Sequence, residues 1–196
     1  MTRSDFSRQS LTTLPNVLTY LRMAAIPVII VLLVSPAPVK SLNIAFVLFV
    51  VASITDYFDG ILARRHNLVT SFGKLIDPLA DKLLTSAVLI MLIPLEKVQP
   101  WLVFLIIGRE ITITGLRSVA ASHGLILNAS RMGKNKMISQ TVALSLLLLS
   151  IPSMQGFLDG LGLFVLWVSV VLSYWSGMDY FMSFYQEAKR QEQQGN

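Results

Sequence analysis

Long apolar segments separated by short polar connections run through most of the chain. A helix that crosses a membrane needs roughly 20 mostly apolar residues. The proline-containing sequence SPAP and, later, Pro94 mark the ends of the first and third segments, since proline cannot continue a helix. Six segments qualify when the polar ends of some are included: 15–34, 42–65, 77–93, 100–121, 136–151 and 159–185. The pattern therefore predicts an all-α integral membrane protein, a bundle of six transmembrane helices.

The positions of lysine and arginine orient this bundle, because short loops rich in these residues stay in the cytoplasm. Only Lys40 and Lys97 fall on one side of the predicted membrane. The other side holds a large basic set: Arg3, Arg8, Arg64, Arg65, Lys74, Arg131, Lys134, Lys136, Lys189 and Arg190. Both termini are therefore predicted to be cytoplasmic. We expect a polar N-terminal segment over 1–14, a six-helix membrane domain over 15–185 and a polar C-terminal tail over 186–196.

Composition agrees with a membrane protein and removes several function classes. Of the 196 residues, 54% are hydrophobic and only 14% are charged, against about 25% charged in ordinary soluble domains. The net charge of +5 does not indicate nucleic-acid binding, because the basic residues lie between apolar segments rather than along one face. The absence of cysteine excludes disulfides, thiolate catalysis and cysteine-ligated zinc. The polar N-terminus lacks a small-residue cleavage site, so we expect no cleaved signal peptide.

Four carboxylates interrupt this apolar pattern in the stretch from Asp56 to Asp81. A charged side chain at membrane depth costs a few kcal/mol, so its presence indicates a functional site. Asp56 and Asp59 are three residues apart and share one face of a helix, and Asp77 and Asp81 are four apart and share a face of the next. Because the connection between the two helices is short, we expect them to be antiparallel, with both carboxylate pairs at the cytoplasmic side.

The chemistry of this acidic set favours divalent metal ions. Carboxylate oxygens suit Mg²⁺ or Mn²⁺, and two such ions can hold the attacking and leaving oxygens of a phosphoryl transfer. A carboxylate at the edge of the set can accept a hydroxyl proton. Gly60 and Gly73 allow a backbone or a ligand to approach closely, and Pro78 suits a first helical turn. Two other interpretations stay open at this point, namely interfacial helix caps and a proton or cation pathway.

The same stretch resembles a known signature. Asp56-Tyr-Phe-Asp59-Gly60-Ile-Leu-Ala63-Arg64, followed by Gly73, Asp77 and Asp81 at fixed spacing, resembles the CDP-alcohol phosphatidyltransferase family at every defining position. The resemblance implies a six-helix membrane fold and two divalent cations, Mg²⁺ or Mn²⁺, held by all four aspartates. It implies that Asp81 is also the general base that activates the acceptor alcohol. It further implies that Gly60, Arg64 and Thr70 contact the CDP moiety of the lipid, with Gly73 of the same signature in the CDP-lipid site. Asn16, which with Thr19 and Arg22 recurs every third position, is expected either to face the nucleotide or to act as a helix-capping or interfacial residue.

A second polar cluster begins inside the fourth apolar segment. Arg109 lies within an apolar run beside Glu110, which we expect to pair with Arg109 or with another nearby cation. Arg117 follows on the same predicted helix, and Arg131, Lys134 and Lys136 follow in the predicted connecting loop. Such cations suit an acceptor that carries its own phosphate. A basic loop beside a membrane is more often a topology signal or a lipid-headgroup contact.

Resemblance extends to this cluster as well. Arg109-Glu110-Ile-Thr-Ile-Thr-Gly115-Leu116-Arg117 and Gly133-Lys134-Asn-Lys136 resemble the phosphatidylglycerophosphate synthase branch of the family, as does the opening Pro15-Asn16-Val-Leu-Thr19-Tyr-Leu-Arg22. This branch implies that three cations bind the phosphate of sn-glycerol 3-phosphate: Arg109, Arg117 and Lys134. It also implies a homodimer.

These expectations combine into one predicted reaction. The chain is expected to transfer a phosphatidyl group from CDP-diacylglycerol to sn-glycerol 3-phosphate, by direct attack of the hydroxyl on the lipid-bearing phosphorus, giving phosphatidylglycerophosphate and CMP. The expected location is the bacterial cytoplasmic (inner) membrane, with the active site facing the cytoplasm. A related enzyme using inositol phosphate, serine or phosphatidylglycerol as acceptor is the nearest alternative. A membrane cation transporter is a remote one, since no polar path runs through 42–51 or 83–93.

Overall fold

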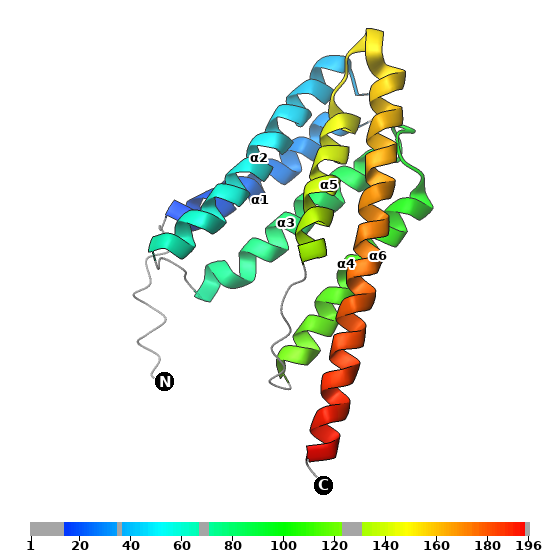
Figure 1. The fold of residues 1–196 in the computed structure, drawn as a ribbon. Helices are drawn as coiled ribbons and strands as arrows, with labels where there is room; N and C mark the ends of the chain where they lie inside the picture. Colours follow the sequence, from blue (N-terminus) through cyan, green and yellow to red (C-terminus); the bar gives the residue numbers. More distant parts are fainter. Residues whose placement is uncertain (1–13, 35–36, 67–70, 123–130, 195–196) are drawn as a thin grey trace. The chain divides into compact units, whose positions relative to one another are not determined.

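A computed structural model describes residues 14–34, 37–66, 71–122 and 131–194 of the chain (Figure 1). Every regular element in these residues is helical, and they contain no strand. The α-helices are α1 (Leu14–Leu33), α2 (Val39–His66), α3 (Ser71–Met91), α4 (Pro100–Ser122), α5 (Arg131–Leu148) and α6 (Gln155–Gln194). A single turn of 3₁₀-helix, Pro152–Met154, precedes α6. The predicted all-α class is confirmed.

The predicted helix boundaries are accurate for α1, α2 and α4 and wrong for the other three. Helix α3 begins at Ser71 rather than at residue 77, and α5 begins at Arg131 rather than at residue 136. Pro78 therefore lies in the interior of α3, and not in its first turn as the sequence suggested. Helix α6 continues to Gln194, through most of the predicted polar tail. Hydropathy marks only the apolar part of a helix, whereas Gln, Glu, Lys and Arg extend a helix readily into polar surroundings.

One helical segment in the described residues, Pro152–Gln186, is long and apolar enough to cross a membrane, with a mean hydropathy of 1.9. Two shorter apolar helical segments, Leu18–Leu33 and Val39–Thr55, belong to α1 and α2. Length and composition thus identify one membrane-capable helix.

The first of two compact units contains α1, α2 and α3 and comprises Met1–Leu95 and Leu148–Ser153. Helix α1 packs against both α2 and α3, and α3 turns back after the end of α2 (Figure 1). Its core consists of fully buried apolar side chains from all three helices, among them Ile29, Leu33, Phe49, Leu84 and Val88. Burial of such residues provides the main stabilisation of the unit.

The second unit contains α4, α5 and α6 and comprises Glu96–Leu147 and Met154–Asn196. Helices α4 and α6 pack side by side (Figure 1). Helix α6 approaches α5 closely at Gly162, where an added Cβ would lie 2.8 Å from Leu147 Cγ. Lys97 joins three segments of the unit, because its ammonium donates to the Leu147 carbonyl at 2.7 Å and to Asp159 Oδ1 at 2.9 Å. A cation at this position stabilises the carbonyl end of α5.

Candidate functional site

The four aspartates of the signature lie on two consecutive helices of the first unit. Asp56 and Asp59 lie on α2, and Asp77 and Asp81 lie on α3. Both segments are helical, as the predicted sharing of a face requires, so the spacings of three and four residues fall within continuous helix. Asp81 is half-buried, and its carbonyl accepts a hydrogen bond from the Thr85 hydroxyl at 3.1 Å.

A metal site at these aspartates stays a prediction. In the described part of the chain, no three acidic or histidine side chains gather in a metal-binding group. The side chains of Asp56, Asp59 and Asp77 lie outside that part. The donor set itself fits the expected ions, since four carboxylates on adjoining helices offer only the hard oxygen ligands that Mg²⁺ and Mn²⁺ prefer.

The residues predicted to bind the CDP-lipid also belong to the first unit. Asn16 lies on α1, Gly60 and Arg64 on α2, and Gly73 on α3. Their side-chain surroundings lie outside the described residues, as does Thr70 entirely.

Helix α1 carries an arginine to which the sequence assigned no definite role. Arg22 is only 3% exposed, and Thr19, one turn before it, is only 4% exposed. A buried charged side chain is uncommon unless it is paired. The available signal was the repeat of polar residues every third position from Asn16, which placed them on one face of the helix.

Polar side chains of the second unit form a cluster that links α4, α5 and α6. Glu110 Oε1 accepts a hydrogen bond from Arg109 Nη1 at 3.3 Å and another from Lys136 Nζ. Arg109 Nε donates to the Ser173 carbonyl on α6 at 3.0 Å. The side chains of Arg109, Glu110 and Lys136 are only 11%, 19% and 10% exposed. The expected pairing of Glu110 is confirmed with both cations.

The structure corrects the location of the following basic residues. Arg131 and Lys134 lie in the first turns of α5 and not in a connecting loop, and Lys136, predicted where that loop meets the fifth helix, also lies within α5. Lys136 is buried against Glu110, whereas the side chain of Lys134 lies outside the described residues.

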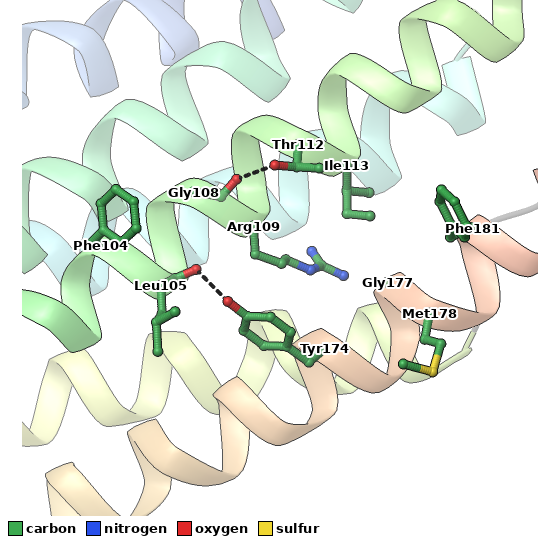
Figure 2. A pocket seen from close by; sticks show the side chains of 10 residues that line it. All are labelled: Phe104, Leu105, Gly108, Arg109, Thr112, Ile113, Tyr174, Gly177, Met178 and Phe181. Carbon is green, nitrogen blue, oxygen red and sulfur yellow. Dashed lines mark hydrogen bonds between the residues drawn. The ribbon is translucent and has the colours of Figure 1, made fainter.

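Arg109 also lines a cavity between α4 and α6. The cavity has a volume of about 470 Å³, within the usual range for small-molecule sites. Among the described residues that line the cavity, Arg109 is the charged one, and Figure 2 shows its guanidinium directed towards α6 near Gly177. The remaining wall is mainly apolar and is formed by Phe104, Leu105, Gly108, Thr112, Ile113, Tyr174, Gly177, Met178 and Phe181. An arginine on an apolar wall suits a ligand that combines an anionic group with an apolar part.

Arg117, the third predicted acceptor residue, has a different environment from Arg109. It is exposed, and its guanidinium carbon lies 5.3 Å from the centre of the Tyr180 ring on α6. This distance is within the range of a cation–π interaction. The ring therefore supports the guanidinium while leaving it accessible.

Comparison with known proteins gives consistent results over most of the chain. The sequence profile of the family described as CDP-alcohol phosphatidyltransferase matches residues 12–175. A protein of Rickettsia bellii (strain RML369-C), named CDP-diacylglycerol–glycerol-3-phosphate 3-phosphatidyltransferase, is 44% identical over 86% of this chain and 93% of its own length. A protein of Bacillus subtilis (strain 168) with the same name is 41% identical over 86% of this chain and 93% of its own length. A rice protein named cardiolipin synthase (CMP-forming) is 38% identical over 85% of this chain and 55% of its own length.

Proposed function

The chain belongs to the CDP-alcohol phosphatidyltransferase family, and we propose that it transfers a phosphatidyl group from CDP-diacylglycerol to sn-glycerol 3-phosphate. The products are phosphatidylglycerophosphate and CMP. The observation that carries the proposal is the complete aspartate signature on α2 and α3, in a chain whose bacterial relatives at 41–44% identity are named for this reaction. The Arg109 side chain, only 11% exposed and lining a cavity of about 470 Å³, supports an acceptor that carries a phosphate.

The residues of the first unit hold the donor in this proposal. Asp56, Asp59, Asp77 and Asp81 would bind two divalent cations, Mg²⁺ or Mn²⁺, through their carboxylates. Bound cations supply positive charge that stabilises the phosphoryl oxygens in the transition state. The CDP-lipid is contacted by Asn16, Gly60, Arg64, Thr70 and Gly73.

The chemical step needs one proton acceptor and no covalent nucleophile. Asp81 takes the proton from the acceptor hydroxyl, whose oxygen forms a bond with the lipid-bearing phosphorus. The bond from that phosphorus to the bridging oxygen breaks, and CMP leaves with the electron pair. Arg109, Arg117 and Lys134 bind the phosphate of the acceptor, since guanidinium and ammonium groups donate charge-assisted hydrogen bonds to phosphate oxygens.

The proposal includes an arrangement in the bacterial cytoplasmic membrane. Six helices span the bilayer as a multi-pass homodimer, both termini are cytoplasmic, and the active site faces the cytoplasm. The apolar segment Pro152–Gln186 and the distribution of basic residues support this arrangement. Because the chain has no cysteine, single cysteines at Lys40 and Gln193 allow a direct test. A membrane-impermeant maleimide added to intact cells should label the first position and leave the second unlabelled.

The reaction is tested by measuring CMP release from purified protein with CDP-diacylglycerol, Mg²⁺ and a panel of acceptors. The panel contains glycerol 3-phosphate, inositol phosphate, serine and phosphatidylglycerol. We expect turnover with glycerol 3-phosphate. Turnover with another acceptor and none with glycerol 3-phosphate would reject the proposed acceptor while retaining the reaction class.

A further inference from the structure

We propose that Glu110 and Lys136 are positioning residues, which hold the Arg109 guanidinium in the orientation that binds the acceptor phosphate. This inference rests on the proposed function and deepens it. It also gives Lys136, a buried lysine of α5, a role in holding Glu110 rather than in binding the ligand.

The guanidinium of Arg109 is held at two of its three nitrogens. Nε donates to the Ser173 carbonyl at 3.0 Å, and Nη1 donates to Glu110 Oε1 at 3.3 Å. Because the guanidinium is planar and rigid, two fixed nitrogens determine the position of the third. Nη2 takes part in neither bond, and the side chain lines the apolar cavity (Figure 2). The arginine is therefore preorganised before any ligand binds, which lowers the cost of binding.

Glu110 needs Lys136 to perform this role without neutralising the arginine. The carboxylate receives hydrogen bonds from both cations at the same oxygen, Oε1. Two cations, Arg109 and Lys136, share the single negative charge of Glu110, so Glu110 alone does not fully neutralise Arg109. A buried excess charge is costly unless an anion compensates it. The cluster thus favours an anionic group at Arg109.

Burial explains why Lys136 serves Glu110 rather than the ligand. Its side chain is only 10% exposed and is engaged with Glu110. Lys136 therefore acts together with Glu110 in positioning the Arg109 guanidinium.

A purely structural ion pair would also bury these residues, so the test must separate stability from acceptor binding. In Glu110→Gln the amide cannot attract both cations as a carboxylate does. We expect the KM for glycerol 3-phosphate to rise roughly tenfold or more, with the KM for CDP-diacylglycerol unchanged and kcat reduced much less. Lys136→Met should raise the acceptor KM in the same way, whereas Lys136→Arg keeps the charge and should restore it.

Asp159→Asn is the matched control, because it also removes a carboxylate paired with a lysine in the same unit, the Lys97 partner. It should lower the Tm without changing the acceptor KM. The inference is overturned if Glu110→Gln leaves the acceptor KM unchanged, or if its KM changes are no larger than those of Asp159→Asn.

If Glu110→Gln does not fold, the contrast between Lys136→Met and Lys136→Arg decides the question. Should the wild-type protein use another acceptor, the proposed function fails, and the same KM comparison with that acceptor still decides the role of Glu110.

Discussion

The side chain of Asn43 pairs with the backbone of Ser150, although 107 residues separate them in the chain. Asn43 Nδ2 donates to the Ser150 carbonyl at 3.0 Å, and the Ser150 amide donates to Asn43 Oδ1 at 2.9 Å. Ser150 is only 6% exposed, so these two bonds replace the water that its backbone would otherwise bind. The pair attaches the segment after α5 to α2 within the first unit.

The first prediction concerns this pair. Asn43→Leu removes both hydrogen bonds that the Asn43 side chain makes with the Ser150 amide and carbonyl. A buried polar group that is left unsatisfied costs about 1–3 kcal/mol of stability. We expect a Tm several degrees lower in detergent, measured by thermal denaturation. Asn135→Leu is the control, because Asn135 is exposed on α5; it should leave the Tm nearly unchanged. Equal Tm values for the two variants would contradict the structural role of the Asn43 amide.

The second prediction uses two neighbouring glycines of α6. Gly162→Ala would place a Cβ 2.8 Å from Leu147 Cγ and 3.3 Å from the Leu147 backbone nitrogen, whereas Gly160 has nothing within 4 Å of its added Cβ. Overpacking costs about 1–3 kcal/mol. Replacing glycine by alanine in a helix stabilises it by about 1 kcal/mol, and this gain applies at both positions. We expect Gly162→Ala to lower the Tm and Gly160→Ala to maintain or raise it. The opposite order would show that α5 and α6 do not pack at Gly162.

Local sequence patterns predicted those features that depend on one helix at a time. Apolar runs predicted the six α-helices of the described residues, and Asp56, Asp59, Asp77 and Asp81 fall within continuous helix, as their predicted pairing by face requires. The ends of α3, α5 and α6 were predicted less well, because a helix can continue into polar sequence when its backbone bonds remain intact.

Features that depend on packing between helices were not predictable in the same way. Arg109 was conspicuous as a cation in an apolar run, but its bond to the Ser173 carbonyl requires a helix 64 residues further along the chain. The pairing of Glu110 with Lys136 spans 26 residues, and the sequence placed that lysine only at the junction of a predicted loop and the fifth helix. No pattern within α4 alone indicates the cavity that α4 and α6 form together.

The third prediction tests the support that Tyr180 gives to Arg117. An exposed cation–π interaction is worth about 0.5–1 kcal/mol, which corresponds to roughly a two- to fivefold change in KM. If Arg117 binds the acceptor phosphate, Tyr180→Leu should raise the KM for glycerol 3-phosphate by this factor. Tyr180→Phe keeps the ring and should behave like the wild type. An unchanged acceptor KM in Tyr180→Leu would mean that the ring does not position the arginine for binding.

The fourth prediction concerns the divalent cations. Treatment of the purified protein with a chelator should abolish CMP release, since the proposed site relies on metal charge to stabilise the transferring phosphoryl group. Adding Mg²⁺ or Mn²⁺ back should restore activity. A chelated protein that retains full turnover would contradict the metal assignment for Asp56, Asp59, Asp77 and Asp81.

The last prediction separates the proposed role of Asp81 as the base from a structural one. Asp81→Asn has almost the same size, and the hydrogen bond that Thr85 makes goes to the backbone carbonyl of Asp81, so the substitution leaves that contact intact. An amide cannot accept the hydroxyl proton, and loss of a general base reduces turnover by about 100-fold or more. We therefore expect CMP release to fall by at least that factor while the Tm stays close to the wild-type value, and added Mg²⁺ should not restore the rate. Near-normal turnover would assign the proton to another group, and a large fall in Tm would indicate that Asp81 mainly stabilises α3.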